Sequence, residues 1–174
     1  MDRFSILVGD ITRSDAEAIV NAANPTLLGG AGVDGAIHAA AGPELLAECR
    51  TLGGCERGQA KLTAGYRLRA RYVIHTPGPV WQGRLPLLAS CYRSCLLLAE
   101  AHSIRTLDFC SISTGVYGYP LPLAATVALR AIMDFLADHA LPERVRMVCR
   151  SEQAAEVYRR TWNLWYAEGK DQRM

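Results

Sequence analysis

The sequence lacks any run of about 18 consecutive apolar residues, the length needed to cross a bilayer, so we expect no membrane-spanning segment. It also lacks an excess of one charge, because 19 basic residues stand against 17 acidic ones and leave a net charge of +2. This balance gives no electrostatic reason to expect nucleic acid or a membrane as a partner. The first residues, MDRFSILVGDITRSD, carry acids within and just after a short apolar stretch, unlike an export signal. We therefore expect a cytoplasmic protein.

Closely spaced cysteine pairs are absent as well, since none of the six cysteines forms a Cys-x-x-Cys motif. This argues against a metal site, and the lack of an export signal argues against a disulfide framework. Cys91 and Cys95 stand four residues apart, in line with Leu88 and Leu98, which places them on the apolar face of a helix. We interpret them as core residues and expect no metal.

The chain of 174 residues has no internal repeat and no linker, and half of its residues are apolar. We expect one domain over residues 1–174, with a core between about residues 4 and 160 and a last helix reaching about residue 168. Strands are predicted at 4–11, 16–24, 59–68, 71–78, 106–113 and 144–150. Helices are predicted at 33–53, 85–104, 122–140 and 151–166, the last with Ser151 as N-cap and an apolar stripe of Ala154, Val157, Tyr158, Thr161, Leu164 and Trp165.

Strands that alternate with helices, after strand–strand joins early in the chain, predict an α/β fold whose mixed sheet is covered on both faces. Ligands of such folds bind beyond the carboxyl ends of the strands, where loops meet the N-termini of helices. The loops at 21–35 and 111–120 are therefore the candidate sites.

The first loop contains GAGVDG at 30–35, which matches the dinucleotide fingerprint G-x-G-x-x-G. A Rossmann-type NAD oxidoreductase would need these glycines directly after the strand, whereas residues 24–28 intervene. It would also need an acid ending the next strand about 20 residues on, where this chain has a turn at 53–56. Asn21 and Asn24 can bind sugar hydroxyls or cap the chain turn, and Asp34 can face a ligand or complement the helix dipole.

The second loop, SISTGVYGYP at 111–120, follows a strand and precedes a helix. Its small and hydroxyl-bearing residues suit a backbone that wraps a diphosphate, with Tyr117 as a cover. It has no lysine of the P-loop type, which argues against a nucleoside triphosphatase.

Two other groups have both a functional and a structural interpretation. Arg67, Arg69 and Arg71 alternate, as in a nucleic-acid stripe or, more simply, the solvated face of an edge strand. His38 and His75 can act in acid–base chemistry, but structural hydrogen bonding is the simpler role.

Several motifs together are more specific than either loop. The chain carries, in order, GDIT at 9–12, VNAANP at 20–25, GVDGAIH at 32–38 and ISTGVYGYP at 112–120. Between them stand AGPELL at 41–46, GCERGQAK at 54–61, YVIHT at 72–76 and GPVW at 78–81. These motifs resemble the macro domain family, in particular its MacroD-type O-acetyl-ADP-ribose deacetylase branch, over roughly residues 4–160.

The resemblance implies a three-layer α/β/α fold with a mixed central sheet and a cleft for ADP-ribose. It implies that Asp10 accepts a hydrogen bond from the adenine amino group, with Ile11 beside it. The diphosphate and the distal ribose would lie among Gly32, Val33, Ser113, Thr114, Gly115, Val116 and Tyr117. Asn24 would hold the distal ribose, and Asp34 would orient or deprotonate a water molecule.

The implied activity is hydrolysis of O-acetyl-ADP-ribose to ADP-ribose and acetate, extending to mono-ADP-ribose on acidic side chains of proteins. No cofactor is implied, and we expect a monomer. The alternative within the family is a module that binds ADP-ribose without hydrolysing it. The presence of both Asn24 and Asp34 favours the enzyme.

The chain departs from the family pattern in three places. Ala31 replaces a glycine beside the distal ribose, the linker at 82–86 is short, and Arg150 stands where relatives carry an aromatic residue near the adenine. A guanidinium can lie over a purine face as an aromatic ring does, or it can point to solvent.

Overall fold

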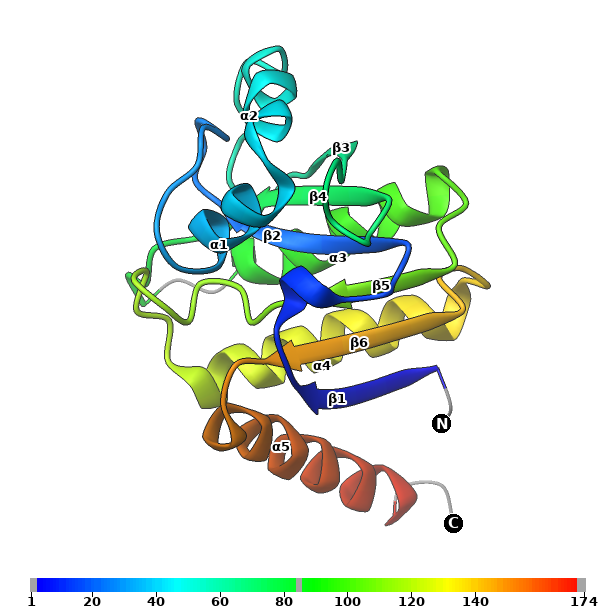
Figure 1. Cartoon of the computed structure of the whole chain (residues 1–174). Helices are drawn as coiled ribbons and strands as arrows, with labels where there is room; N and C mark the ends of the chain where they lie inside the picture. Colours follow the sequence, from blue (N-terminus) through cyan, green and yellow to red (C-terminus); the bar gives the residue numbers. More distant parts are fainter. Residues whose placement is uncertain (1–2, 84–85, 172–174) are drawn as a thin grey trace.

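The computed structural model describes residues 3–83 and 86–171 (Figure 1). Six strands are present: β1 (Phe4–Val8), β2 (Ala18–Ala23), β3 (Lys61–Ala64), β4 (Tyr72–Pro77), β5 (Thr106–Phe109) and β6 (Arg144–Cys149). Five α-helices and one short 3-10 helix accompany them: η1 (Ile11–Arg13), α1 (Gly32–Ala41), α2 (Pro43–Arg50), α3 (Pro86–Ala101), α4 (Leu121–Asp138) and α5 (Glu152–Asp171).

The strands form one sheet in the order β1-β6-β5-β2-β4-β3. All neighbouring pairs are parallel except β3 with β4, so the sheet is mixed, as predicted. Because five strands run the same way, their carboxyl ends meet at one edge of the sheet. The start of β1 and the end of α5 lie on the opposite side of the molecule, at the amino ends of the parallel strands (Figure 1).

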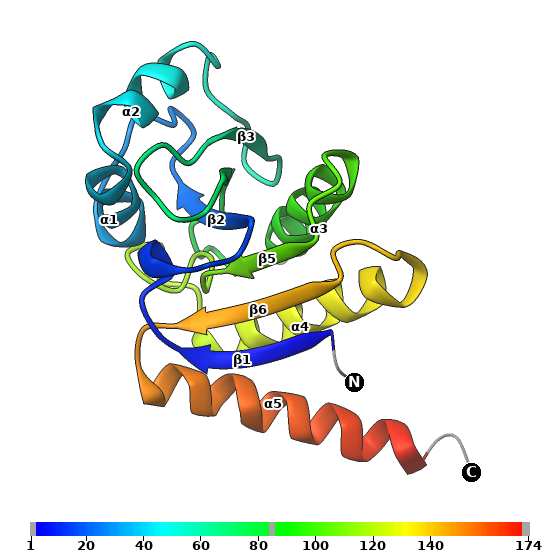
Figure 2. The same ribbon diagram turned by 45° about the vertical axis from the view of Figure 1, so that its right-hand side comes forward.

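The helices form layers on the two faces of the sheet. Helices α1 and α2 cover the part built from β2, β4 and β3, while α3 and α4 pack on the opposite face (Figure 2). Helix α5 packs against α4 and against the edge strand β1, where Trp162 stacks on Phe4 with ring centroids 5.2 Å apart. The three-layer α/β/α architecture is confirmed.

The predicted single helix at 33–53 is wrong, because the chain forms two helices there. Gly42 separates them with a φ of +91°, a backbone conformation that ends α1 and that side chains rarely adopt. Pro43 then occupies the first turn of α2, where its missing N–H costs nothing. A Cβ at position 42 would also lie 2.9 Å from the Arg67 side chain.

The observed strands are shorter than predicted, and β3 ends at Ala64. Arg67, Arg69 and Arg71 therefore lie in the turn between β3 and β4, all exposed, rather than along an edge strand. Cys91 and Cys95 are fully buried, as predicted, and all six cysteines are free.

Helix α5 runs to Asp171, slightly beyond the predicted end. Ser151 caps it as predicted, since its Oγ accepts a hydrogen bond from the Ala154 N–H at 3.2 Å. Leu164 is 60 % exposed and so does not belong to the buried stripe, which includes Ala155 instead. None of the described helices is long and apolar enough to cross a membrane.

Candidate functional site

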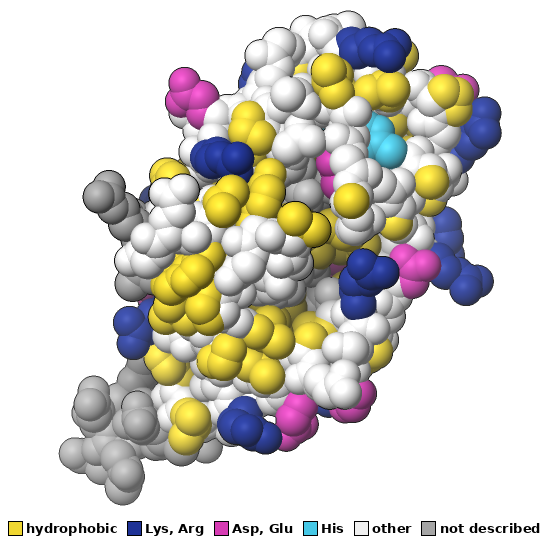
Figure 3. Space-filling view, turned by 90° about the vertical axis from the view of Figure 1, so that its left-hand side faces the viewer, with side chains coloured by type: hydrophobic (Ala, Val, Ile, Leu, Met, Phe, Trp, Pro, Cys, Tyr) yellow, Lys and Arg dark blue, Asp and Glu magenta, His cyan; other side chains and the backbone are white. Residues whose placement is uncertain are grey.

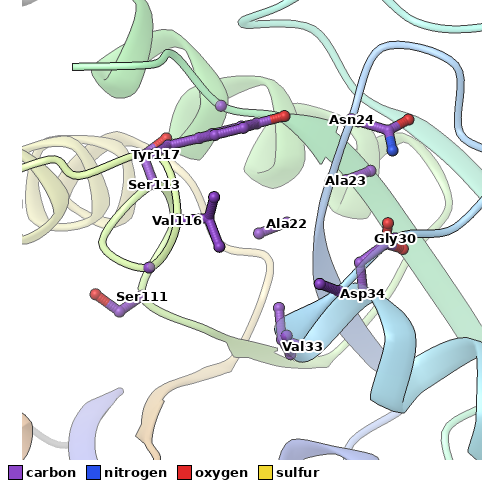
Figure 4. A pocket seen from close by; sticks show the side chains of 14 residues that line it. Ala22, Ala23, Asn24, Gly30, Val33, Asp34, Ser111, Ser113, Val116 and Tyr117 are labelled. Carbon is purple, nitrogen blue, oxygen red and sulfur yellow. The ribbon is translucent and has the colours of Figure 1, made fainter.

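Two adjoining cavities lie where the parallel strands end, on the hollowed face shown in Figure 3. The first, of about 250 Å³, is shown in Figure 4. Eight predicted site residues line it: Asn24, Gly32, Val33, Asp34, Ser113, Gly115, Val116 and Tyr117. Asn24 and Asp34 lie on the side formed by β2 and α1, opposite Val116 and Tyr117 of the loop after β5 (Figure 4).

The second cavity, of about 730 Å³, brings in Asp10, Ile11, Thr114 and Arg150. It shares Gly32, Val33, Ser111, Gly115 and Val116 with the first, so the two form one continuous groove. Its volume is that of a typical small-molecule site. All the predicted site residues except Asn21 thus line this groove.

Asp34 projects from the first turn of α1 and is 4 % exposed. Its Oδ1 accepts a hydrogen bond from Asn21 Nδ2 at 2.8 Å and lies 3.5 Å from His38 Nε2, one helical turn away. Burial raises the pKa of the Asp34 carboxyl, and the Asn21 amide and the His38 ring act in the opposite direction. The second oxygen, Oδ2, faces Gly30, where an added Cβ would lie 3.1 Å from it.

Asn24 follows the end of β2 and shapes the loop that leads to α1. Its Oδ1 accepts hydrogen bonds from the backbone N–H and the hydroxyl of Thr26, and its Nδ2 donates to the Gly29 carbonyl at 2.8 Å. This is the local capping role that asparagine often plays in turns. One N–H of the amide remains for the cavity, which Asn24 also lines.

Asn21 does not line the groove, which corrects its predicted contact with a ligand. It is fully buried on β2, where its amide is held behind Asp34 and beside His75. Neither histidine stands apart from the site: His38 contacts Asp34, and His75 contacts Asn21. The Asp34–His38 spacing of four residues in a helical segment was a signal that could have joined them.

The loop after β5 is held by groups from distant helices. Tyr158 OH of α5 lies 2.7 Å from Ser111 Oγ, and Tyr92 OH of α3 accepts a hydrogen bond from the Ile112 N–H at 3.2 Å. Ser113 has a φ of +66°, a conformation that is costly for a residue with a side chain. Sequence reasoning found the loop but not the two tyrosines that fix it.

Arg57 is a further residue whose contact with the site the sequence did not reveal. Its guanidinium lies 5.1 Å from the centroid of the Tyr117 ring and donates a hydrogen bond to the Gly78 carbonyl. The backbone N–H of Trp81 donates to the Tyr117 backbone carbonyl at 2.9 Å. The aromatic wall of the first cavity is therefore held from behind.

Asp10 and Arg150 lie at the far end of the groove. Asp10 caps η1: its Oδ1 accepts hydrogen bonds from the Thr12 hydroxyl at 2.7 Å and from the Thr12 N–H at 3.0 Å. These bonds hold the pKa of Asp10 below its usual value, so its carboxylate is an acceptor. Arg150 is exposed at the end of β6 and lines the same cavity.

Within residues 3–83 and 86–171, no cluster of three His, Cys, Asp or Glu side chains could hold a metal ion. The groove thus offers hydrogen-bonding groups and one buried carboxylate, without a metal centre among the described residues.

Comparison with known proteins gives a consistent result. The family model of the macro domain matches residues 20–128. A Salmonella gallinarum protein named O-acetyl-ADP-ribose deacetylase is 52 % identical over 166 residues, covering 91 % of this chain and 93 % of that protein. The ADP-ribose glycohydrolase MACROD2 of Xenopus laevis is 51 % identical over 95 % of this chain, which matches 41 % of MACROD2.

A solved structure agrees with these relatives. The Trypanosoma brucei macrodomain in complex with ADP-ribose superposes with a TM-score of 0.88 at 46 % identity, covering 91 % of this chain and 68 % of that one. The family model spans more than half of this chain, and the relatives match it almost from end to end. The chain therefore belongs to the macro domain family.

Proposed function

We propose that this macro domain is a hydrolase that cleaves O-acetyl-ADP-ribose to ADP-ribose and acetate, and that it also removes mono-ADP-ribose from acidic side chains of proteins. The observation that carries the proposal is the convergence of Asn24 and Asp34 at one end of a groove whose other end presents Asp10. The names of the relatives, a deacetylase and a glycohydrolase of ADP-ribose, support it.

The groove accounts for each part of ADP-ribose by a different kind of contact. The Asp10 carboxylate is an acceptor for the adenine amino group, with the buried Ile11 beside the base. The free N–H groups at the start of α1 and the backbone of the loop at 113–117 suit the diphosphate. Asn24 and Tyr117 then border the distal ribose.

The chemistry is the addition of water to an ester, with Asp34 as the base. Asp34 Oδ2 accepts a proton from a water molecule as the water oxygen attacks the acyl carbon. The bond between the acyl carbon and the ribose oxygen then breaks, the ribose oxygen takes the proton from Asp34, and acetic acid leaves and ionises to acetate. Because burial raises the pKa of Asp34, the ionised carboxylate is a stronger base than an exposed aspartate.

The substrate range follows from the open end of the first cavity. Gly30 and Ala31 are exposed beside Asp34, so a polypeptide esterified to the ribose can leave the cavity there. Ala31 lines the first cavity together with Asn24 and Asp34.

The experiment is incubation of the protein with O-acetyl-ADP-ribose and, separately, with a protein mono-ADP-ribosylated on glutamate, followed by mass spectrometry of the products. We expect ADP-ribose with acetate from the first and free ADP-ribose from the second. Asp34→Ala is the control for contaminating esterases. Tight binding of ADP-ribose without release of acetate would identify a binding module instead.

A further inference from the structure

A buried polar network extends behind Asp34, away from the groove. It consists of Asn21 on β2, His75 on β4 and Thr63 on β3, each with 0 % exposure. Asn21 and His75 are direct partners in the sheet register, and Thr63 pairs with Val73, two residues before His75. The three side chains therefore point to the same face of the sheet, the face that α1 covers.

The hydrogen bonds of this buried polar network have only one consistent assignment of donors and acceptors. Asn21 Nδ2 lies 2.8 Å from Asp34 Oδ1 and 3.1 Å from His75 Nδ1. An amide nitrogen only donates, so His75 Nδ1 must be the unprotonated acceptor. The ring proton then sits on Nε2, which lies 2.9 Å from Thr63 Oγ1, and the Thr63 hydroxyl donates to the Ala64 carbonyl at 3.1 Å.

The opposite orientation of the Asn21 amide would reverse its effect on Asp34. The amide oxygen would then face both Asp34 Oδ1 and His75 Nδ1, an arrangement that needs a proton on each of those atoms. A flipped amide would thus favour the protonated, inactive form of Asp34. The acceptor at His75 Nδ1 opposes the flip, and Thr63 holds the tautomer that provides it.

The charge state of this buried polar network is constant near neutral pH. Burial lowers the pKa of His75 to about 3, so the ring is neutral. Other titratable groups that face Asp34 are His38 on α1, the Cys49 thiol on α2 and the Cys110 thiol after β5. Burial raises the pKa of Cys49 to about 11 and that of Cys110 to about 12, so both thiols are also neutral.

We propose that His75 and Thr63 are positioning residues: acting through the Asn21 amide, they keep the Asp34 carboxylate ionised and aimed at the groove. This inference rests on the proposed function, because it assigns to Asp34 the role of the base. It also explains why a polar network is buried against the sheet, where apolar side chains would pack without the need for hydrogen-bond partners.

The test measures the titration of the Asp34 carboxyl directly, by NMR of the ¹³C-labelled full chain, with the signal assigned by its loss in Asp34→Asn. His75→Leu removes the acceptor and should raise the Asp34 midpoint by about one pH unit. His75→Asn keeps an acceptor oxygen at the place of Nδ1 and should restore the midpoint. Cys49→Ala is the matched control, since it removes an Sγ that lies 3.9 Å from His75 Nε2 but leaves the Nδ1 acceptor and the Thr63 hydroxyl in place.

The pH profile of ester hydrolysis should follow the same order. The acidic limb of kcat/KM should move to higher pH in His75→Leu and return to the wild-type pH in His75→Asn. If His75→Leu does not fold, Thr63→Val decides, with a smaller rise in the same direction. A folded His75→Leu or Thr63→Val with the wild-type Asp34 midpoint overturns the inference, as does an equal rise in Cys49→Ala. Absence of hydrolysis by the wild type refutes the proposed function instead, while the NMR midpoints still report on positioning.

Discussion

Replacing Gly78 by alanine is expected to damage the loop at 111–117 from behind. A Cβ at position 78 would lie 2.2 Å from Ser113 Oγ and 2.7 Å from Ile112 Cγ2, where ordinary contacts begin at 3.4 Å. The Ser113 hydroxyl can rotate away, but the Ile112 methyl is fixed on a branched, fully buried side chain. The loop therefore has to move by roughly 1 Å.

The magnitude follows from the usual cost of overpacking, about 1–3 kcal/mol. If this strain is relieved by a loop position that no longer fits the diphosphate, affinity for ADP-ribose falls about 5- to 150-fold. If the loop stays in place, the strain appears in stability instead, at roughly 2–4 °C of Tm per kcal/mol for a domain of this size.

Calorimetric titration with ADP-ribose and thermal unfolding of the same samples separate the two outcomes. Gly115→Glu is the matched variant. A Cβ at position 115 meets nothing within 4 Å, and the backbone of Gly115 is not in the left-handed region, so the fold tolerates a side chain there. Gly115→Glu should abolish binding by its bulk and charge while leaving Tm unchanged. Wild-type affinity together with wild-type Tm in Gly78→Ala would refute the contacts described for this loop.

Three further predictions concern single side chains. Asp34→Ala should lower ester hydrolysis by about two or more orders of magnitude while ADP-ribose affinity changes little, and near-wild-type turnover would exclude Asp34 as the base. Arg150→Ala should weaken ADP-ribose binding about 2- to 30-fold, the equivalent of roughly 0.5–2 kcal/mol, if its guanidinium covers the adenine; unchanged affinity would mean that it points to solvent. Because the pKa of His75 is lowered to about 3 in the folded protein, the unfolded chain binds the proton first as pH falls below about 6.5, so stability is lost between these values. Unfolding at pH 7 and pH 5 should therefore show a smaller loss in His75→Asn than in the wild type, and an equal loss would contradict a neutral His75.

The order of strands and helices was readable from the sequence because apolar runs and helical periods are local signals. Residues 33–53 show the limit of such local signals, because the helical pattern continues on both sides of Gly42 although the helix itself is interrupted there. The turn at 65–71 shows the same limit, because alternating arginines look like a strand until the backbone reverses after Ala64.

The candidate site was predictable where its residues belong to contiguous motifs. Asp34 and Tyr117 stand in such motifs, and both line the groove. The layer behind the groove was not predictable, because it depends on side chains from separate strands and helices. Asn21 is the clearest case: the motif placed it at the site, but only the packing of β2 against β4 turns its amide toward Asp34 and away from the ligand.

The bond between Tyr158 and Ser111 has a consequence for shortened or fused forms of the chain. These two residues lie 47 positions apart, yet they join the first half of α5 to the start of the loop at 111–120. A deletion that removes α5 would release this loop and would also remove Ala154 from the wall of the second cavity. Loss of binding after C-terminal truncation would therefore combine the release of this loop with the loss of one small wall residue. Asp171 lies more than three helical turns past this anchor, so a tag attached beyond it is expected to leave the bond between Tyr158 and Ser111 in place.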